Sequence, residues 1–201
     1  DLRSNSRALI ARLGDTRTAL ASQVVEQLFR SDLPEGVPSH LLSLLRLELS
    51  EFISEVPSAT LWRLIRSKRP ILQEVGVFLL QKRPYEPIEI SALALLASHE
   101  TKAVREAAWA MFEQRVAQVR LQLGEAILLL DARWDDSRNF AFHYFKEKFE
   151  PSDFSPDVLI AMCDSIRPDV QAFGQQMLLR CFEERYGEHY LMHLSEHPSP
   201  A

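Results

Sequence analysis

The chain has 201 residues, of which 46% are hydrophobic and 25% are charged, so it is long enough to bury a large core. Its formal net charge of −5 disfavours a dedicated DNA-wrapping protein, because such proteins normally carry a strong basic excess. No apolar stretch approaches the roughly 18–20 residues of a membrane span, and no signal peptide is visible. The scarcity of glycine, with six residues, and the near absence of period-two alternation predict an all-α fold.

Residues 1–55 predict helices that follow no regular pattern. Apolar stripes over residues 1–30 predict one or two helices, and the prolines and glycine of residues 31–38 predict a loop. A further helix is expected over residues 39–52, but Glu48 falls on one of its core positions. We therefore interpret residues 1–55 as a divergent N-terminal region, either an irregular repeat or a cap.

From residue 56 onward the sequence repeats itself every 32 to 33 residues. Each unit has an equivalent reference position, and apolar or small residues follow it three, four, seven and eight positions later. The reference residues are Leu72, Val104, Ser137 and Val170. Such a period is typical of a solenoid, in which each unit buries its apolar face only against its neighbours.

The same pattern predicts the helices of each unit. Four helical hairpins are expected over residues 58–82, 87–123, 125–149 and 155–186, and the first half of a fifth over residues 191–201. The second helices of the four hairpins are expected over residues 70–82, 101–123, 136–149 and 168–186.

The turns within these hairpins carry residues that favour the start of a helix. Pro70 and Pro168 occupy equivalent positions in a first turn, where a missing N–H is tolerated because it would be unbonded anyway. Asp136 and Asp169 share the next position, where a carboxylate meets free N–H groups and the favourable end of the helix dipole. We interpret both aspartates as helix-capping residues.

One position in each second helix is occupied only by small residues, namely Gly76, Ala108, Ala141 and Gly174. Glycine inside a helix costs about 1 kcal/mol relative to alanine, so its presence indicates that a neighbouring helix crosses closely at this position. A leucine in place of Ala141 or Gly174 is expected to destabilise the fold by about 1–3 kcal/mol through overpacking.

Residues 103–112 read Ala-Val-Arg-Glu-Ala-Ala-Trp-Ala-Met-Phe, which resembles the second helix of HEAT-like repeats, especially the short bacterial kind. Such helices read Val-Arg-x-x-Ala-Ala-x-x-Leu after a turn containing Asp or Pro. Only the second unit here carries the full pattern, and the period is shorter than in large eukaryotic HEAT units. The resemblance covers residues 56–201 and implies a right-handed α-α superhelix of the HEAT/armadillo-like solenoid type. Because these repeats serve scaffolds, adaptors, transport receptors, certain lyases and DNA-repair proteins, the resemblance predicts architecture better than function.

Residues at two equivalent positions of each second helix form the candidate partner-binding surface. Second helices of HEAT-like arrays line the concave face, and the residues expected there are Gln73, Arg105, Trp109, Arg138, Phe142, Gln171 and Gln175. Arginine beside aromatic side chains is a frequent composition of protein-binding hot spots, and the same combination can hold phosphate and stack on bases. A structural interpretation stays open, in which the arginines tie the turn of one unit to the next.

Histidines and cysteines near the end of the chain suggest metal or disulfide chemistry only weakly. His189, His193 and His197 are spaced four apart, but the following prolines interrupt the helix that would bring them together, so we predict no metal site. Cys163 and Cys181 are expected about 15 Å apart on an antiparallel helix pair, too far for a disulfide. Reduced core thiols are the better interpretation and favour a cytoplasmic protein.

The sequence as a whole predicts a non-catalytic scaffold without a cofactor. Asp135 and Asp136 are adjacent carboxylates, but turn chemistry explains them better than catalysis, and no phosphate-binding loop or nucleophile elbow is present. The expected partner is another protein or another domain of the parent chain, bound along the second helices. The alternative is a nucleic-acid-binding domain that grips a phosphate backbone through a local Arg/aromatic ridge. The irregular start and the incomplete fifth unit predict a fragment of a larger protein.

Overall fold

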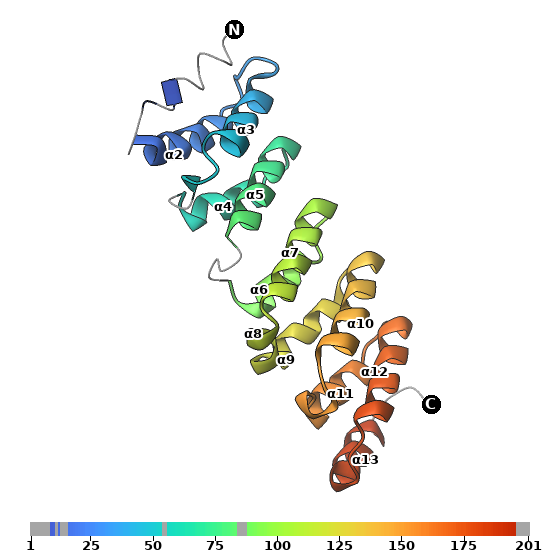
Figure 1. Cartoon of the computed structure of the whole chain (residues 1–201). Coiled ribbons are helices and arrows are strands. Elements are labelled where there is room, and N and C mark those ends of the chain that lie inside the picture. Colours follow the sequence, from blue (N-terminus) through green and yellow to red (C-terminus); the bar gives the residue numbers. More distant parts are fainter. Residues whose placement is uncertain (1–8, 11, 13–15, 54–55, 84–87, 196–201) are drawn as a thin grey trace. The chain divides into compact units, whose positions relative to one another are not determined.

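The computed structural model describes residues 9–10, 12, 16–53, 56–83 and 88–195 (Figure 1). Within these ranges the chain forms helices and turns and no strand, which confirms the predicted all-α class. None of the helices in these ranges combines the length and the apolar composition needed to cross a bilayer. Pro87 at the start of the second predicted hairpin, and residues 196–201 of the predicted fifth unit, lie outside the described residues.

The chain divides into two compact units, residues 1–86 and 87–201. The boundary falls within the stretch that the sequence predicts to be one continuous array. The first unit contains two helix pairs, in which the earlier helix packs against the later one. Its helices are α2 (Arg17–Leu28), α3 (Val37–Leu47), α4 (Ser58–Ile65) and α5 (Pro70–Lys82).

The helix predicted over residues 39–52 differs from the structure at both ends. Helix α3 begins at Val37, because Gly36 before it adopts a left-handed conformation with φ of 83° and Pro38 occupies the first turn. It ends at Leu47, so Glu48 lies at its C-cap rather than in the middle of a helix. The acidic residue that made this segment look irregular is therefore placed where the helix stops.

Side chains from the second helix pair hold the first pair in place. Arg63 of α4 forms an ion pair with Glu26 of α2 at 2.7 Å. Arg69, just before α5, donates to the carbonyl oxygens of residues 28, 29 and 30 at 3.1–3.3 Å. These are carbonyls at the C-terminal end of α2, which lack partners within the helix. The Nη1 group of one arginine is therefore shared among three carbonyl oxygens that have no partner within the helix.

The second unit is built from two rows of helices (Figure 1). The first-helix row contains α6 (Ile90–Leu96), α9 (Leu123–Ala126) with the 3₁₀ helix η3 (Ile127–Asp131), α11 (Pro156–Cys163) and α13 (Gly187–Ser195). The second-helix row contains α7 (Lys102–Gln114), α10 (Asp135–Lys148) and α12 (Pro168–Cys181). Short connecting helices are α8 (Val116–Leu121), η4 (Pro151–Asp153) and η5 (Glu184–Tyr186).

Two predicted second helices are too long. The helix expected over residues 101–123 ends at Gln114, and the one expected over residues 168–186 ends at Cys181. At the first of these ends the buried Arg115 leaves the helical conformation and donates to the carbonyl oxygen of Ile88 at 3.4 Å. That contact anchors the end of α7 to the chain entering α6. The apolar residues that follow form α8 instead of continuing α7.

Close helix crossings explain the two glycines inside the second helices, as predicted, whereas the crossings expected at Ala108 and Ala141 stay a prediction. A Cβ atom added to Gly174 would lie 2.5 Å from the carbonyl carbon of Met162 and 2.7 Å from the backbone nitrogen of Cys163. A Cβ atom at Gly76 would lie 2.8 Å from the Cγ1 atom of Ile65. Helix α12 therefore touches the backbone of α11, and α5 touches α4, at distances that leave no room for a side chain.

Candidate functional site

Arg105, the first arginine of the predicted surface, is buried between neighbouring helices. Only 5% of the residue is exposed. Its guanidinium donates to both carboxylate oxygens of Asp136, at 3.1 and 2.6 Å, and so joins α7 to α10. The remaining donor reaches the carbonyl oxygens of His99 and Glu100, each at 3.0 Å. This side chain therefore binds the turn before its own helix and the start of the next helix in the row.

Arg138 makes an equivalent set of contacts 33 residues later. The residue is 8% exposed, and its Nε atom donates to Asp169 of α12 at 2.7 Å. Its Nη1 atom donates to the carbonyl oxygens of Ala132 and Arg133 at 3.0 and 3.3 Å. A second carboxylate, Asp135, accepts from Nη2 at 2.5 Å. The structural interpretation of these arginines thus has direct geometric support in both cases.

Gln73 of the first unit makes one of the two kinds of contact that the arginines make, namely the one to the preceding turn. It is buried, and its Nε2 atom donates to the carbonyl oxygen of Ser67 at 2.8 Å, six residues earlier. Arg105 reaches the carbonyl oxygen of His99 across the same interval of six residues. The amide thus reproduces the contact to the preceding turn.

The sequence contains a spacing that predicts these ion pairs and was not recognised when residues were considered one at a time. Each arginine precedes its aspartate by 31 residues, as in Arg105 with Asp136 and Arg138 with Asp169. Gln73, by contrast, is followed 31 residues later by Val104. Comparing the arginine of each unit with the aspartate of the following unit would have paired the charges, whereas comparing residues at the same position of every unit does not.

The aromatic residues of the predicted surface also contact the neighbouring helix. Trp109 stacks on Phe140 with ring centroids 5.4 Å apart, and its indole N–H donates to the Ser137 hydroxyl at 3.2 Å. Phe142 packs against Phe173 at 4.8 Å between centroids. Trp109 and Phe142 are half-buried. They therefore form part of the packing between α7, α10 and α12 and are only partly exposed to solvent.

Further contacts show that α7 and α10 run side by side in the same direction. Beyond the stacked Trp109 and Phe140, the buried Tyr144 hydroxyl donates to the carbonyl oxygen of Phe112 at 2.9 Å. The contacts advance together along both helices, which is the pattern of a parallel pair. Burial also raises the pKa of Tyr144, so its hydroxyl remains a donor at neutral pH.

Gln171 and Gln175 complete the predicted surface on α12. Gln171 is half-buried and Gln175 is exposed. Three of the seven predicted residues are thus buried, and contact between any of the seven and a partner stays a prediction. The residues one position after those of the predicted surface in the second unit are exposed, namely Glu106, Ala110, Asn139, His143, Ala172 and Gln176.

The two aspartates interpreted as caps do lie in the first turn of a helix. The cap positions themselves are occupied by Trp134 and Arg167, in extended backbone, so neither aspartate is the N-cap residue. Both carboxylates do meet backbone N–H groups of the first turn, as expected, because those of Ser137 and Val170 help to lower their pKa. Each carboxylate also accepts from an arginine on the preceding helix of the row. Pro168 stands in the first turn of α12, as predicted.

The ion pairs perturb the ionisation of their members. The hydrogen bond from Arg105 holds the pKa of Asp136 below its usual value, although partial burial opposes this shift. Burial alone would raise the pKa of Asp169, but the hydrogen bond and charge of Arg138 outweigh burial and the pKa is lowered. Burial opposes the charged form of Arg138, but its carboxylate partners raise the pKa of this guanidinium overall.

These shifts predict a loss of stability in acid. Because the folded pKa of Asp136 is depressed, its ion pair stabilises the fold fully above the unfolded pKa of about 4 and progressively less as pH falls through the folded pKa. Asp136→Asn should therefore lower the free energy of unfolding at pH 7, and its difference from the wild type should shrink towards pH 3. Urea denaturation at both pH values measures this. A difference that stays constant over the range would contradict a stabilising role for the carboxylate charge.

The histidines and cysteines near the end of the chain do not assemble a metal site in the part that the structure describes. His189 contacts Asp157 at 2.8 Å and lies 4.6 Å from the His193 ring, whereas His197 is outside the described residues. Among the described residues no group of three potential ligands converges. Cys163 and Cys181 are both buried and free, and burial raises the pKa of both thiols.

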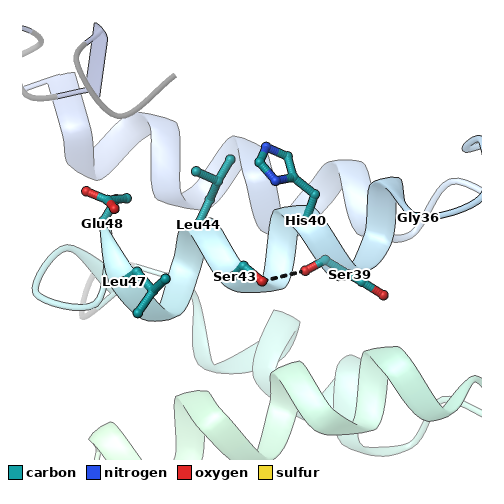
Figure 2. Close-up of a pocket in the computed structure, with 7 residues that line it drawn as sticks. All are labelled: Gly36, Ser39, His40, Ser43, Leu44, Leu47 and Glu48. Atoms are coloured by element: carbon teal, nitrogen blue, oxygen red, sulfur yellow. Dashed lines mark hydrogen bonds between the residues drawn. The ribbon is translucent and has the colours of Figure 1, made fainter. Parts of the chain in front are cut away.

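A groove of about 310 Å³ lies along α3 in the first unit (Figure 2). Its lining residues come from this one helix and the residues that cap its two ends: Gly36, Ser39, His40, Ser43, Leu44, Leu47 and Glu48. Its ionisable residues are His40, near the middle of the groove, and Glu48, at one end (Figure 2). Eight residues correspond to about 12 Å along a helix, which is too far for the two groups to act on one proton.

The geometry thus places Arg105, Arg138, Trp109 and Phe142 in contacts between adjoining helices. No family model, curated protein or solved structure matches this chain.

Proposed function

We propose that the chain is a helical-repeat scaffold of the HEAT-like solenoid type, which binds another protein or another domain of its parent along the second-helix row. One observation carries this proposal. The contacts of Arg105 with Asp136 recur, 33 residues later, in those of Arg138 with Asp169. Recurring contacts between successive helices are the means by which repeat proteins build a continuous surface.

The second-helix row suits recognition because its supports are rigid. Buried arginines and stacked aromatic rings hold α7, α10 and α12 side by side, so exposed side chains on these helices keep a fixed spacing. Asn139, His143 and Gln176 are exposed on this row and offer hydrogen bonds to a partner. Such a surface binds through many small contacts over a large area.

Nucleic-acid binding through the same arginines receives no comparable support. The guanidinium donors of Arg105 and Arg138 already face carboxylates and backbone carbonyls. Phosphate contact would require these guanidinium groups to leave their carboxylate and carbonyl partners, which opposes binding.

A variant series tests the proposed surface. The purified chain is used to capture proteins from an extract of its source cells, and each partner's affinity is then measured for the double variant Asn139→Arg, Gln176→Arg. We expect at least about a tenfold loss of affinity, because two bulky charges would interrupt the contact area. The control is Gln118→Arg, an exposed position on α8 that lies outside both rows.

Circular dichroism and thermal unfolding verify that each variant is folded. Equal affinity of the double variant and the wild type for every captured partner would reject the second-helix row as the binding surface. An equal loss with Gln118→Arg would assign the effect to added positive charge and would also reject this surface.

A further inference from the structure

The outward face of the first-helix row in the second unit carries an apolar stripe that the proposed function does not use. Leu95 of α6 is 71% exposed and Leu128 of η3 is 44% exposed. Ala161 of α11 is also exposed, and the three residues follow one another at intervals of 33 positions. Since α6, η3 and α11 pack against one another in that order, the stripe runs across the row.

A groove deepens the stripe between η3 and α11. It has a volume of about 170 Å³ and is open to solvent. Its apolar lining includes Leu128, Ala161 and Met162, and its polar lining includes Asp131 and Ser165. Gly124 contributes no side chain to its wall, and Ala161 contributes only a methyl group. Since a cavity of about 150 Å³ can hold a benzene molecule, the groove has room for one aliphatic side chain with a carboxylate beside it.

Carboxylates border the stripe on both sides. Residues 88–100, 123–132 and 155–166, which include the outer helices, contain no Lys or Arg but six acidic residues: Glu89, Glu100, Glu125, Asp131, Asp157 and Asp164. Glu125 and Asp131 stand three residues before and after Leu128. Asp157 and Asp164 stand four residues before and three after Ala161. Residues three or four apart share one face of a helix, so acidic and apolar side chains face outward together.

Neighbouring groups modify this acidic border without reversing it. The Asp131 carboxylate accepts a hydrogen bond from the Ser165 hydroxyl at 3.4 Å, and Asp157 contacts His189 of α13 at 2.8 Å. Arg133 and Arg167 follow the outer helices in the turns, and the guanidinium of Arg133 lies over the adjacent Trp134 ring, 5.3 Å from its centroid. The charge presented beside the stripe is therefore mainly negative.

From this combination we propose that the first-helix row binds a basic amphipathic helix of another protein, laid across α6, η3 and α11. Adjacent packed helices are about 8–10 Å apart, and residues i and i+7 of the bound helix are about 10.5 Å apart along its axis. Aliphatic residues at i, i+7 and i+14 then meet Leu95, Leu128 and Ala161 in turn, with the middle one in the groove. Lysines and arginines beside them face the carboxylates. This surface is separate from the second-helix row and does not depend on a partner bound there.

The test uses a designed peptide of about 18 residues, with Leu along one face, Lys on its flanks and Ala elsewhere. Its binding to the full chain is followed by fluorescence anisotropy, and the same composition in a scrambled, non-amphipathic order serves as the peptide control. We expect the amphipathic peptide to bind at least about tenfold more tightly than the scrambled one, since both carry the same charge. Equal binding of the two peptides, or no binding of either, would overturn the inference.

Matched protein variants separate this site from general attraction between opposite charges. Asp131→Asn with Asp164→Asn should weaken the amphipathic peptide about tenfold, and Leu128→Lys should weaken it at least as much. Glu106→Gln with Glu147→Gln changes net charge by the same amount on the second-helix row and should alter affinity less than about twofold. Equal losses in the two charge-neutralised pairs would overturn the proposal.

Sedimentation of the chain alone tests whether a second copy of the chain, rather than another protein, occupies the stripe. A dimer that Leu128→Lys dissociates would make this face a self-association surface and overturn the inference. Failure of the peptide assay leaves the captured-partner assay of the second-helix row unaffected, so the two proposals fail separately.

Discussion

Replacement of Gly174 by alanine is expected to destabilise the second unit by about 2–3 kcal/mol, through overpacking against the backbone of α11. The added Cβ atom would lie 2.5–2.7 Å from the backbone of Met162 and Cys163. Backbone atoms cannot rotate away as a side chain can, so the two helices must separate. Separation also weakens the packing of the residues around them. Urea denaturation at constant m-value measures the change.

Two other glycines provide matched controls for this substitution. Gly187, in the first position of α13, has nothing within 4 Å of an added Cβ, so Gly187→Ala should be neutral or stabilise by up to about 1 kcal/mol. Gly76→Ala should be milder than Gly174→Ala, because the closest atom belongs to the Ile65 side chain. If Gly174→Ala and Gly187→Ala had the same effect, the close approach of α12 to α11 would be wrong.

The second large effect is expected at Arg138. Arg138→Met keeps the aliphatic stem but leaves two carbonyl oxygens and Asp169 without their donor. Breaking a buried ion pair costs about 3–5 kcal/mol, but the Asp169 side chain is 43% exposed and can be hydrated. We therefore expect a loss of about 2–3 kcal/mol in the free energy of unfolding.

A double-mutant cycle isolates the ion pair within this loss. Arg138→Met and Asp169→Asn should couple by about 1 kcal/mol, because each removes the partner of the other. Lys148→Met is the control on the same helix, since its pair with Glu113 at 3.0 Å is open to solvent and should contribute less than about 1 kcal/mol. Strict additivity of the cycle would show that Arg138 and Asp169 do not stabilise each other.

The sequence-based prediction of helices succeeded where apolar spacing and turn residues agreed. Pro70 and Pro168 begin α5 and α12 as predicted, and Gly76 and Gly174 lie at close crossings. Helix ends were predicted less well, as the end of α7 illustrates. Its end depends on the contact of Arg115 with the carbonyl oxygen of Ile88, 27 residues away. Apolar periodicity within one segment contains no information about such a contact.

The candidate surface shows the same limit for function. Arg105 and Arg138 were candidates for an exposed surface because a charged residue in a helix is usually solvated, and the structural interpretation from the sequence could not name their partners. The partners are 31 residues away in sequence and become neighbours only when successive helices pack. The acidic border of the apolar stripe was missed for a related reason, since its members are dispersed over three segments.

The amino-acid sequence by itself determined the helical class, the helix-starting prolines and the positions where small side chains are required, because each depends on local backbone chemistry or on periodicity. Only the tertiary structure decided which charged residues form buried contacts between helices and which are exposed and available for binding. It paired Arg138 with Asp169, and it aligned Leu95, Leu128 and Ala161 into one stripe. Both outcomes depend on how helices pack side by side, and side-by-side packing brings together residues that are about one repeat apart in the chain.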